Sequence, residues 1–213
     1  MRRLLILGIC GWIAGCQRGE PPAPTLDAAV APLPPPPALT SLDAGIKDSA
    51  VTVAVNDAGE EPGSLPQTKD KPAASGAGFD ARVAAFWDGI VSDDVDRALP
   101  FFFPLKAYEQ VKDVGNPASD WKRRLVAAYR RDIHALHKRL GDHASTAKFV
   151  RIEVPDERAR WVEPAEEYNK LGYYRVYGTR VVYSVDDKER SFDVSSLISW
   201  RGEWYVVHLT GFK

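Results

Sequence analysis

The chain divides near residue 79 into two stretches of very different composition. Residues 17–78 contain no Phe, Trp or Tyr, although they hold 11 of the 16 prolines of the 213-residue chain. Such a segment cannot bury enough apolar surface to offset the entropy that is lost when a chain becomes ordered. Residues 79–213 contain every aromatic side chain except Trp12, and they are long enough for one domain with its own core. The sequence therefore predicts a disordered Pro/Ala-rich tether over 16–78 and a single folded domain over 79–213.

The start of the chain has the layout of a secretory signal peptide. A basic beginning at Arg2 and Arg3 is followed over 4–14 by an apolar run of eleven residues. This run is too short to span a bilayer, which takes roughly 20 residues, but it suits the apolar region of a cleaved signal. We therefore expect 1–15 to be a signal peptide and the mature protein to be exported.

The signal ends in the motif Ile13-Ala14-Gly15-Cys16, which resembles the lipobox of bacterial lipoproteins. The resemblance implies that a diacylglycerol is attached to Cys16, that the chain is cut before this residue, and that the new amino terminus is acylated with a fatty acid such as palmitate. Each buried CH₂ group contributes about 0.8 kcal/mol, so several acyl chains anchor a protein without a spanning helix. The alternative is an ordinary signal peptide that is cut near the same small residues and leaves Cys16 unmodified.

Lipidation would account for both cysteines of the chain. Cys10 would be lost with the signal and Cys16 would carry the lipid, so the mature chain would have no disulfide. The next residue is Gln17 rather than Asp, which resembles the pattern for sorting to the outer membrane in enteric bacteria. We expect a protein of the bacterial cell envelope that binds the lipid bilayer through Cys16, with its domain on the periplasmic or surface side.

The spacing of apolar residues in the domain predicts helices followed by strands. Helical spacing is found over 80–92, 95–99 and 120–140, and the stretches that follow are rich in β-branched and aromatic residues. The strands are expected over 146–154, 158–162, 173–185 and 191–209. This order predicts an α+β domain in which N-terminal helices pack on one face of a curved antiparallel sheet.

Two turns and one irregularity are expected in the strand-rich part. The dipeptide Asp186-Asp187 suits a tight hairpin turn. Residues 201–203 suit a three-residue loop that would place Trp200 opposite Trp204 on the paired strands. Gly178, in the middle of a long strand, predicts a bulge or a strong bend.

The order of the elements and one hairpin resemble a known fold family. The sequence WRGEWYV over 200–206 is similar to the W-x-G-x-W-Y-V ending of nuclear-transport-factor-2-like (cystatin-like) domains, and a helix with Phe86 and Trp87 lies near the domain start. The resemblance implies a cone in which helices cover a curved sheet. In enzymes of this family such as ketosteroid isomerase, it also implies an apolar pocket with an Asp base and a Tyr donor.

The expected helix 120–140 has a basic face opposite its apolar stripe. At about 100° per residue, the basic side chains fall within roughly 140° of the helix surface. They are Arg123, Arg124, Arg130, Arg131, His134, His137 and Lys138. An anion-facing surface of this kind would suit lipid headgroups, an acidic envelope protein or an anionic polymer, with arginines binding phosphate in bidentate fashion. The alternative is the solvated face of a core helix.

A second candidate site is a pocket between the sheet and the helices. Tyr173, Tyr177 and Tyr183 share one face of the expected strand 173–185, and Asp193 on the next strand is the acid best placed to act with them. Such a set would suit ligand binding or isomerase-like catalysis. The alternative is that these tyrosines pack the core, which is the commoner role of tyrosine in strands.

Other chemistries find little support in the sequence. The domain carries 22 basic and 21 acidic residues, which gives no argument for nucleic acid binding. The spacing of His134, His137 and His143 favours surface histidines over a metal site, and we expect no cofactor. The sequence thus predicts a non-catalytic binding or scaffolding module, with a small-molecule-binding or enzymatic domain as the alternative.

Overall fold

The structure, a computed structural model, describes residues 61–209 of the chain. The predicted signal peptide 1–15, Cys16 with its lipobox, and the tether up to residue 60 lie outside the described residues. Within 61–209, none of the helices combines the length and the apolar character that crossing a bilayer requires.

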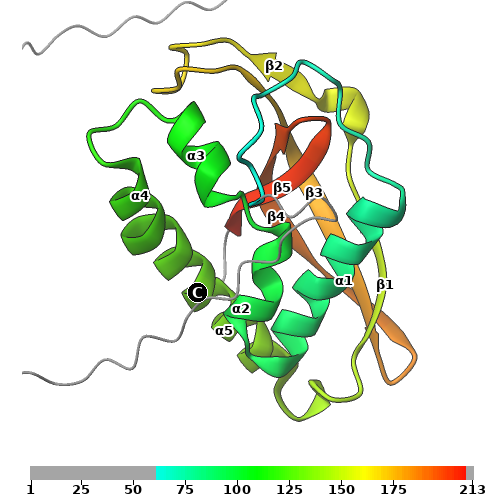
Figure 1. Cartoon of the computed structure of the whole chain (residues 1–213). Coiled ribbons are helices and arrows are strands. Elements are labelled where there is room, and N and C mark those ends of the chain that lie inside the picture. Colours follow the sequence, from blue (N-terminus) through cyan, green and yellow to red (C-terminus); the bar gives the residue numbers. More distant parts are fainter. Residues whose placement is uncertain (1–60, 210–213) are drawn as a thin grey trace, which may run out of the picture. The chain divides into compact units, whose positions relative to one another are not determined.

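Helices come first in the described chain (Figure 1). The first, α1 (Ala77–Ser92), ends where Asp93 adopts a positive φ of 55°. Asp94 then caps α2 (Val95–Ala98) by accepting a hydrogen bond of 2.9 Å from the backbone N–H of Asp96. A short 3₁₀ turn, η1 (Leu99–Phe101), follows. The two helices predicted from the spacing are confirmed, including the break between them.

A further helix, α3 (Leu105–Val111), lies in a stretch for which the sequence predicts no element. It begins after Pro104, whose fixed φ suits the entry into a helix, and it buries Ala107, Tyr108 and Val111. Three well-spaced apolar residues in one short segment are too few for a periodicity argument, so tertiary burial decides this helix.

The long helix predicted over 120–140 is confirmed, but it starts earlier and contains one widened turn. It runs as α4 (Pro117–Asp120), a π-helical turn η2 (Trp121–Val126) and α5 (Ala127–Leu140). Its cap is Asn116, whose side chain accepts from the N–H of Ser119 at 3.0 Å.

The sequence explains the π-helical turn. The apolar stripe steps from Trp121 to Leu125, Tyr129 and Ile133 in fours, and each such step overshoots the 3.6-residue period by about 40°. A π turn holds more residues than an α turn, and it therefore keeps the stripe facing the core. Leu125, Tyr129 and Ile133 are each 1% exposed.

Five strands form one antiparallel sheet. They are β1 (Lys148–Glu153), β2 (Arg160–Val162), β3 (Tyr173–Val185), β4 (Lys188–Trp200) and β5 (Glu203–Leu209). Their order is β1-β3-β4-β5, and β2 pairs with the start of β3. Two 3₁₀ turns, η3 (Gly141–His143) and η4 (Asp156–Arg158), precede β1 and β2. The sheet is curved and does not close on itself (Figure 1). The predicted α+β class, with helices followed by a curved antiparallel sheet, is confirmed.

The β4–β5 hairpin differs from the prediction in its register. Trp200 pairs with Glu203, and Trp204 pairs with Ser199, across the two-residue turn Arg201-Gly202. Both turn residues have positive φ (50° and 74°), as in the type I′ turn, whose twist matches that of paired strands. The prediction that Trp200 lies opposite Trp204 across a three-residue loop is therefore wrong.

The β3–β4 hairpin has the predicted turn. Asp186 and Asp187 both adopt positive φ (50° and 59°). Pairing continues in one register from this turn to Arg175 and Ile198, and Gly178, with a φ of 80°, does not shift it. The register shifts of the sheet lie instead in the β1–β3 and β4–β5 pairs.

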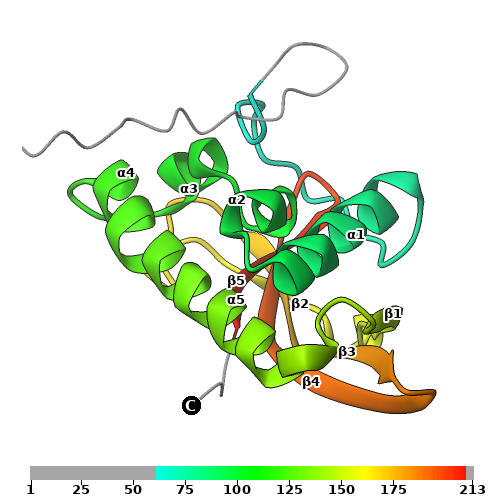
Figure 2. The ribbon, with the colours of Figure 1, turned by 90° about the horizontal axis from the view of Figure 1, so that it is seen from below.

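Aromatic rings fill the space between the helices and the sheet. Figure 2 shows α1 and α5 on the same side of β3 and β4. Between these layers, the ring of Phe86 lies 5.7 Å from Phe101 and 6.4 Å from both Tyr129 and Phe192. Phe102 stacks on Tyr129 at 4.4 Å. The helices are therefore fixed to the sheet by a continuous aromatic core.

Residues 61–76, which the sequence places in the tether, lie against the domain in the structure. We call this segment the strap. The Nε2 of Gln67 donates to the carbonyl oxygens of Gly172 (3.2 Å) and Ser199 (3.3 Å), and its Oε1 accepts from the N–H of Arg201 (2.8 Å). Ala73 forms a bridge with Glu203 at the edge of β5. The chain thus contacts the domain before the predicted boundary at residue 79.

Candidate functional site

The structure gives partners to some of the predicted anion-facing residues. Arg124 binds Asp120 at 2.8 Å and donates to the hydroxyl of Tyr108 at 3.0 Å. The Nδ1 of His137 lies 3.0 Å from the carbonyl oxygen of Ile90. These two side chains serve contacts within the domain, so the predicted surface is smaller than the helix periodicity indicates.

Four of the predicted residues have no ion-pair partner within 61–209. They are Arg123, Arg130, Arg131 and Lys138, all of them exposed. We call these four side chains the basic face. His134 lies between them on the helix and pairs with Asp93 at 2.8 Å.

The structure does not bring the predicted tyrosines together with Asp193. Tyr183 is buried in the core, with its ring 5.5 Å from Trp87 and 6.2 Å from Phe192. Asp193 is exposed, and its cross-strand partner is Arg180, which it binds at 3.1 Å. Because Arg180 and Tyr183 are an odd number of positions apart on β3, Asp193 projects from the opposite face of the sheet. The predicted pairing of a tyrosine with this acid is therefore wrong.

Two hollows lie on the described surface, and neither of them is lined by the predicted pocket residues. One lies beside β1 and β3, and the other lies beside the β3–β4 turn. Their linings are Glu153, Val154, Pro155, Arg158, Gly178 and Arg180 for the first, and Ser145, Thr146, Ala147, Lys148, Ser184, Asp186 and Asp187 for the second. Neither hollow includes any of the three tyrosines.

The three histidines of the sequence cluster contact separate groups. His134 meets Asp93 and His137 meets a backbone carbonyl, while His143 lies 3.7 Å from Asp186. Among residues 61–209, no group of three or more His, Cys, Asp or Glu side chains could hold a metal ion.

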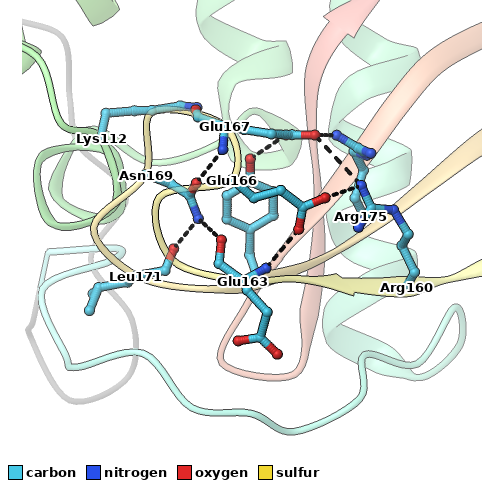
Figure 3. Close-up of polar contacts among 9 residues, drawn as sticks. Lys112, Arg160, Glu163, Glu166, Glu167, Asn169, Leu171 and Arg175 are labelled. Atoms are coloured by element: carbon cyan, nitrogen blue, oxygen red, sulfur yellow. Dashed lines mark hydrogen bonds and ion pairs between the residues drawn. The ribbon is translucent and has the colours of Figure 1, made fainter.

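A polar network surrounds the loop that joins β2 to β3 (Figure 3). Tyr173 belongs to this network through its hydrogen bond to Glu167. Asn169, which is 2% exposed, holds this loop. Its Nδ2 donates to the carbonyl oxygens of Glu163 and Leu171 at 3.0 Å each, and its Oδ1 accepts from the N–H of Glu167 at 2.7 Å. The loop conformation is therefore set by one buried amide.

The loop directs two carboxylates at the sheet. Glu166 binds Arg160 of β2 at 2.7 Å. Glu167 binds Arg175 of β3 and accepts a hydrogen bond of 2.7 Å from the hydroxyl of Tyr173. Two adjacent residues of one loop thus neutralise two arginines of the sheet (Figure 3).

Lys112, the residue after α3, contacts the same loop. Its Nζ donates to the backbone carbonyl of Glu167 at 3.0 Å and lies 5.9 Å from the centre of the Tyr173 ring. Its backbone pairs with Asn169. The lysine is therefore held against the β2–β3 loop, near the ring of Tyr173 (Figure 3).

The pKa values show which groups share the surroundings of Lys112. Desolvation lowers the pKa of Lys112, the positive charges of Arg124 and Arg175 lower it further, and the negative charge of Asp120 opposes them. Desolvation, followed by the charges of Arg124 and Lys112, lowers the pKa of His208 on β5. Lys112 and side chains from α3, α4, η2, β3, β5 and the β2–β3 loop therefore interact through hydrogen bonds or charge. We call them the Lys112 cluster, whose members are Tyr108, Lys112, Asp120, Arg124, Glu167, Tyr173, Arg175 and His208.

The pKa of Asp120 is lowered, whereas the pKa values of the two phenols of the cluster are raised. The hydrogen bond from Arg124, followed by that from Tyr108, lowers the pKa of Asp120 to about 2. Burial raises the pKa of both Tyr108 and Tyr173 to about 12. At neutral pH, Asp120 is therefore ionised and both phenols keep their protons.

Sequence reasoning missed most of this cluster. Lys112 lies in the stretch for which no element was predicted, and Glu167 lies in a loop without a motif. Tyr173 was considered, but with a different acid as its partner. The members are spread over a hundred positions, from Tyr108 to His208, so no local spacing could have indicated that they interact.

Comparison of this chain with protein-family models, with curated proteins and with solved structures gives no match. The fold and the sites define an α+β protein with an exposed basic helix face and a partly buried polar cluster. The likeness to nuclear-transport-factor-2-like domains stays a prediction from the sequence.

Proposed function

We propose that this chain is a lipid-anchored lipoprotein of the bacterial envelope whose α+β domain is a non-catalytic binding or scaffolding module for an anionic partner. The observation that carries the proposal is the basic face: four exposed cations on one helix without an ion-pair partner within 61–209. The lipobox at Cys16 supports the anchoring, and the partner is an acidic envelope protein or an anionic polymer.

The position of these cations supports a common role. Arg130, Arg131 and Lys138 lie within about 100° of one another around an α-helix. The opposite stripe of α5 is buried, so these side chains cannot turn toward the core. The Debye length is about 8 Å at physiological ionic strength, and neighbouring charges on one helix face therefore act together on an anion.

The packing of the core supports binding rather than catalysis. Tyr183, which was a candidate catalytic donor, fills space between Trp87 and Phe192. Its proposed acid, Asp193, lies on the other face of the sheet and pairs with Arg180. A module of this kind acts through its outer surface.

The proposal is tested by the salt dependence of binding to heparin, which serves as a model anionic polymer. The full-length protein in dodecyl maltoside is applied to immobilised heparin and eluted with a NaCl gradient. We expect the wild type to be retained at low salt and R130E/R131E/K138E to elute at clearly lower NaCl, since counter-ion release scales with the number of contacting cations.

A matched variant separates this face from overall charge. K148E/K188E/R190E reverses three exposed cations on β1 and β4 that also have no ion-pair partner within 61–209. It changes the net charge by the same amount and should elute close to the wild type. Equal shifts in both variants, or a wild type that is not retained at 50 mM NaCl, would overturn the proposal.

A further inference from the structure

The charges of the Lys112 cluster do not balance. Arg124 is paired with Asp120, and Arg175 is paired with Glu167. Lys112 has no carboxylate within 4 Å in the described part of the chain, and the contact of its ammonium is the backbone carbonyl of Glu167. An ammonium group has three donors, so this lysine is a partly buried positive charge with donors to spare.

A second donor of the same network is also without a partner. The side chain of Arg175 is 12% exposed, and its Nε is buried without a hydrogen-bond acceptor among residues 61–209. Buried donors are nearly always satisfied, and leaving one unpaired costs about 1–3 kcal/mol. The face of Arg175 lies 4.6 Å from the ring of Tyr177, which holds the guanidinium in place.

The surroundings of Lys112 suit a negative group. The positive charges of Arg124 and Arg175 lower the pKa of Lys112, and the charges of Lys112 and Arg124 lower the pKa of His208. The phenols of Tyr108 and Tyr173 already donate to Asp120 and Glu167. Each carboxylate of the cluster thus bonds an arginine and a tyrosine, and although the charge of Asp120 also acts on Lys112, neither carboxylate lies within 4 Å of the ammonium.

We propose that the Lys112 cluster binds a small oxyanion, a phosphate or carboxylate group, with Lys112 as its principal counter-ion. The ammonium would donate to the anion while it keeps its bond to the Glu167 carbonyl. Arg124 and Arg175 would add long-range attraction. This site is separate from the basic face and does not depend on the function proposed for it.

The test is the thermal unfolding of the full-length protein in dodecyl maltoside with increasing inorganic phosphate, and separately with acetate, at an ionic strength held constant with NaCl. At a phosphate concentration ten times the Kd, we expect the Tm to rise by about 3–6 °C. A response to phosphate alone, or to acetate alone, identifies which oxyanion the site takes. If neither anion raises the Tm above the NaCl reference, the proposal is overturned.

Two variants assign the response to this site. Lys112→Met keeps the aliphatic stem beside Tyr173 and should abolish the rise in Tm. Lys170→Met is the matched control, because the Nζ of Lys170 also bonds a backbone carbonyl, that of Glu109, at 3.1 Å. It should retain the rise in Tm. A Lys112→Met protein that responds like the wild type would contradict the proposal.

A direct measurement covers the case in which Lys112→Met does not fold. Bound oxyanion should raise the pKa of Lys112, which can be followed through the ¹³Cε resonance of the wild-type protein. An unchanged pKa at saturating phosphate would overturn the proposal. R130E/R131E/K138E should keep the phosphate response, so failure of the heparin test and failure of this one are distinguishable.

Discussion

Arg160 and Arg175 face each other as cross-strand partners on β2 and β3. Like charges placed directly opposite in an antiparallel pair destabilise it. Here each arginine has its own carboxylate, Glu166 for Arg160 and Glu167 for Arg175, supplied by the loop that joins the two strands. The loop therefore stabilises the pairing of the strands that it connects.

Glu167→Gln should destabilise the domain. The change removes the counter-charge of Arg175, whose side chain is largely buried, and weakens the acceptor of the Tyr173 hydroxyl. We expect a loss of about 1–3 kcal/mol in the free energy of unfolding, measured by urea titration. Glu157→Gln is the control, because Glu157 and Arg158 are both more than 70% exposed. It should change stability by less than about 0.5 kcal/mol, and a similar loss in both variants would refute the argument.

The free energy of unfolding should depend on pH in part through Asp132. Burial raises the pKa of this carboxyl to about 6. A raised folded-state pKa contributes stability that is present below the unfolded value near 4 and is lost as the pH rises through 6. Asp132→Asn should therefore be more stable than the wild type at pH 7 by about 1 kcal/mol or less, because solvent screens this half-exposed group. The difference between the two proteins should vanish near pH 4, and a difference that is independent of pH would contradict this.

Asp120 should affect the pH dependence of the free energy of unfolding in the opposite direction. Its pKa of about 2 lies below the unfolded value, since Arg124 and Tyr108 bond the ionised form. The stability that it provides is present above about pH 4 and is lost as the pH falls toward 2. Asp120→Asn should lower the urea midpoint at pH 7 and flatten its fall on acidification. Equal midpoints of variant and wild type at pH 7 would show that the pair contributes nothing.

Gln67→Ala should release the strap from the end of the sheet. It removes the bonds to the carbonyls of Gly172 and Ser199 and to the N–H of Arg201. We expect faster hydrogen exchange at Arg201 and faster proteolysis within 61–76, with a loss of about 1–3 kcal/mol in stability. Thr68→Ala, which alters only an exposed contact with Asp70, serves as the control. Unchanged exchange in Gln67→Ala would mean that the strap does not depend on this side chain.

Cys16→Ser should abolish lipidation and processing. If Cys16 is the acylated residue, the serine variant should accumulate at the mass of the unprocessed chain and should not incorporate labelled palmitate. The wild type should partition into the detergent phase of Triton X-114. Normal processing and palmitate labelling of the serine variant would refute the lipoprotein assignment.

The order and type of most elements could be predicted because they depend on local patterns. The helix 120–140 has a long apolar stripe, and the strand 173–185 has a long run of β-branched and aromatic residues. In contrast, α3 is too short for such a pattern. The register at Trp200 and Trp204 was missed because one extra residue in a turn changes every pair that follows it.

A candidate site could be predicted better when its residues are close together in the sequence. The basic face comes from one helix, so its four exposed members are a subset of the residues that the periodicity selected. Arg124 pairs with Asp120 one turn earlier on the same helix, whereas its contact with Tyr108 and the contact of His137 with Ile90 involve other helices that periodicity does not reveal. Most of the Lys112 cluster was missed, since its ionisable side chains come from α3, α4, η2, β3, β5 and two loops.

The sequence by itself determined the α+β class, the long amphipathic helix and the order of the strands, because apolar periodicity and turn residues act between near neighbours in the chain. Only the tertiary structure decided which charges are neutralised. Lys112 meets Glu167 across 55 positions, and Gln67 meets Arg201 across 134. The energy of a charge depends on its distance to other charges and on its exposure to water, and neither quantity exists until the chain has folded.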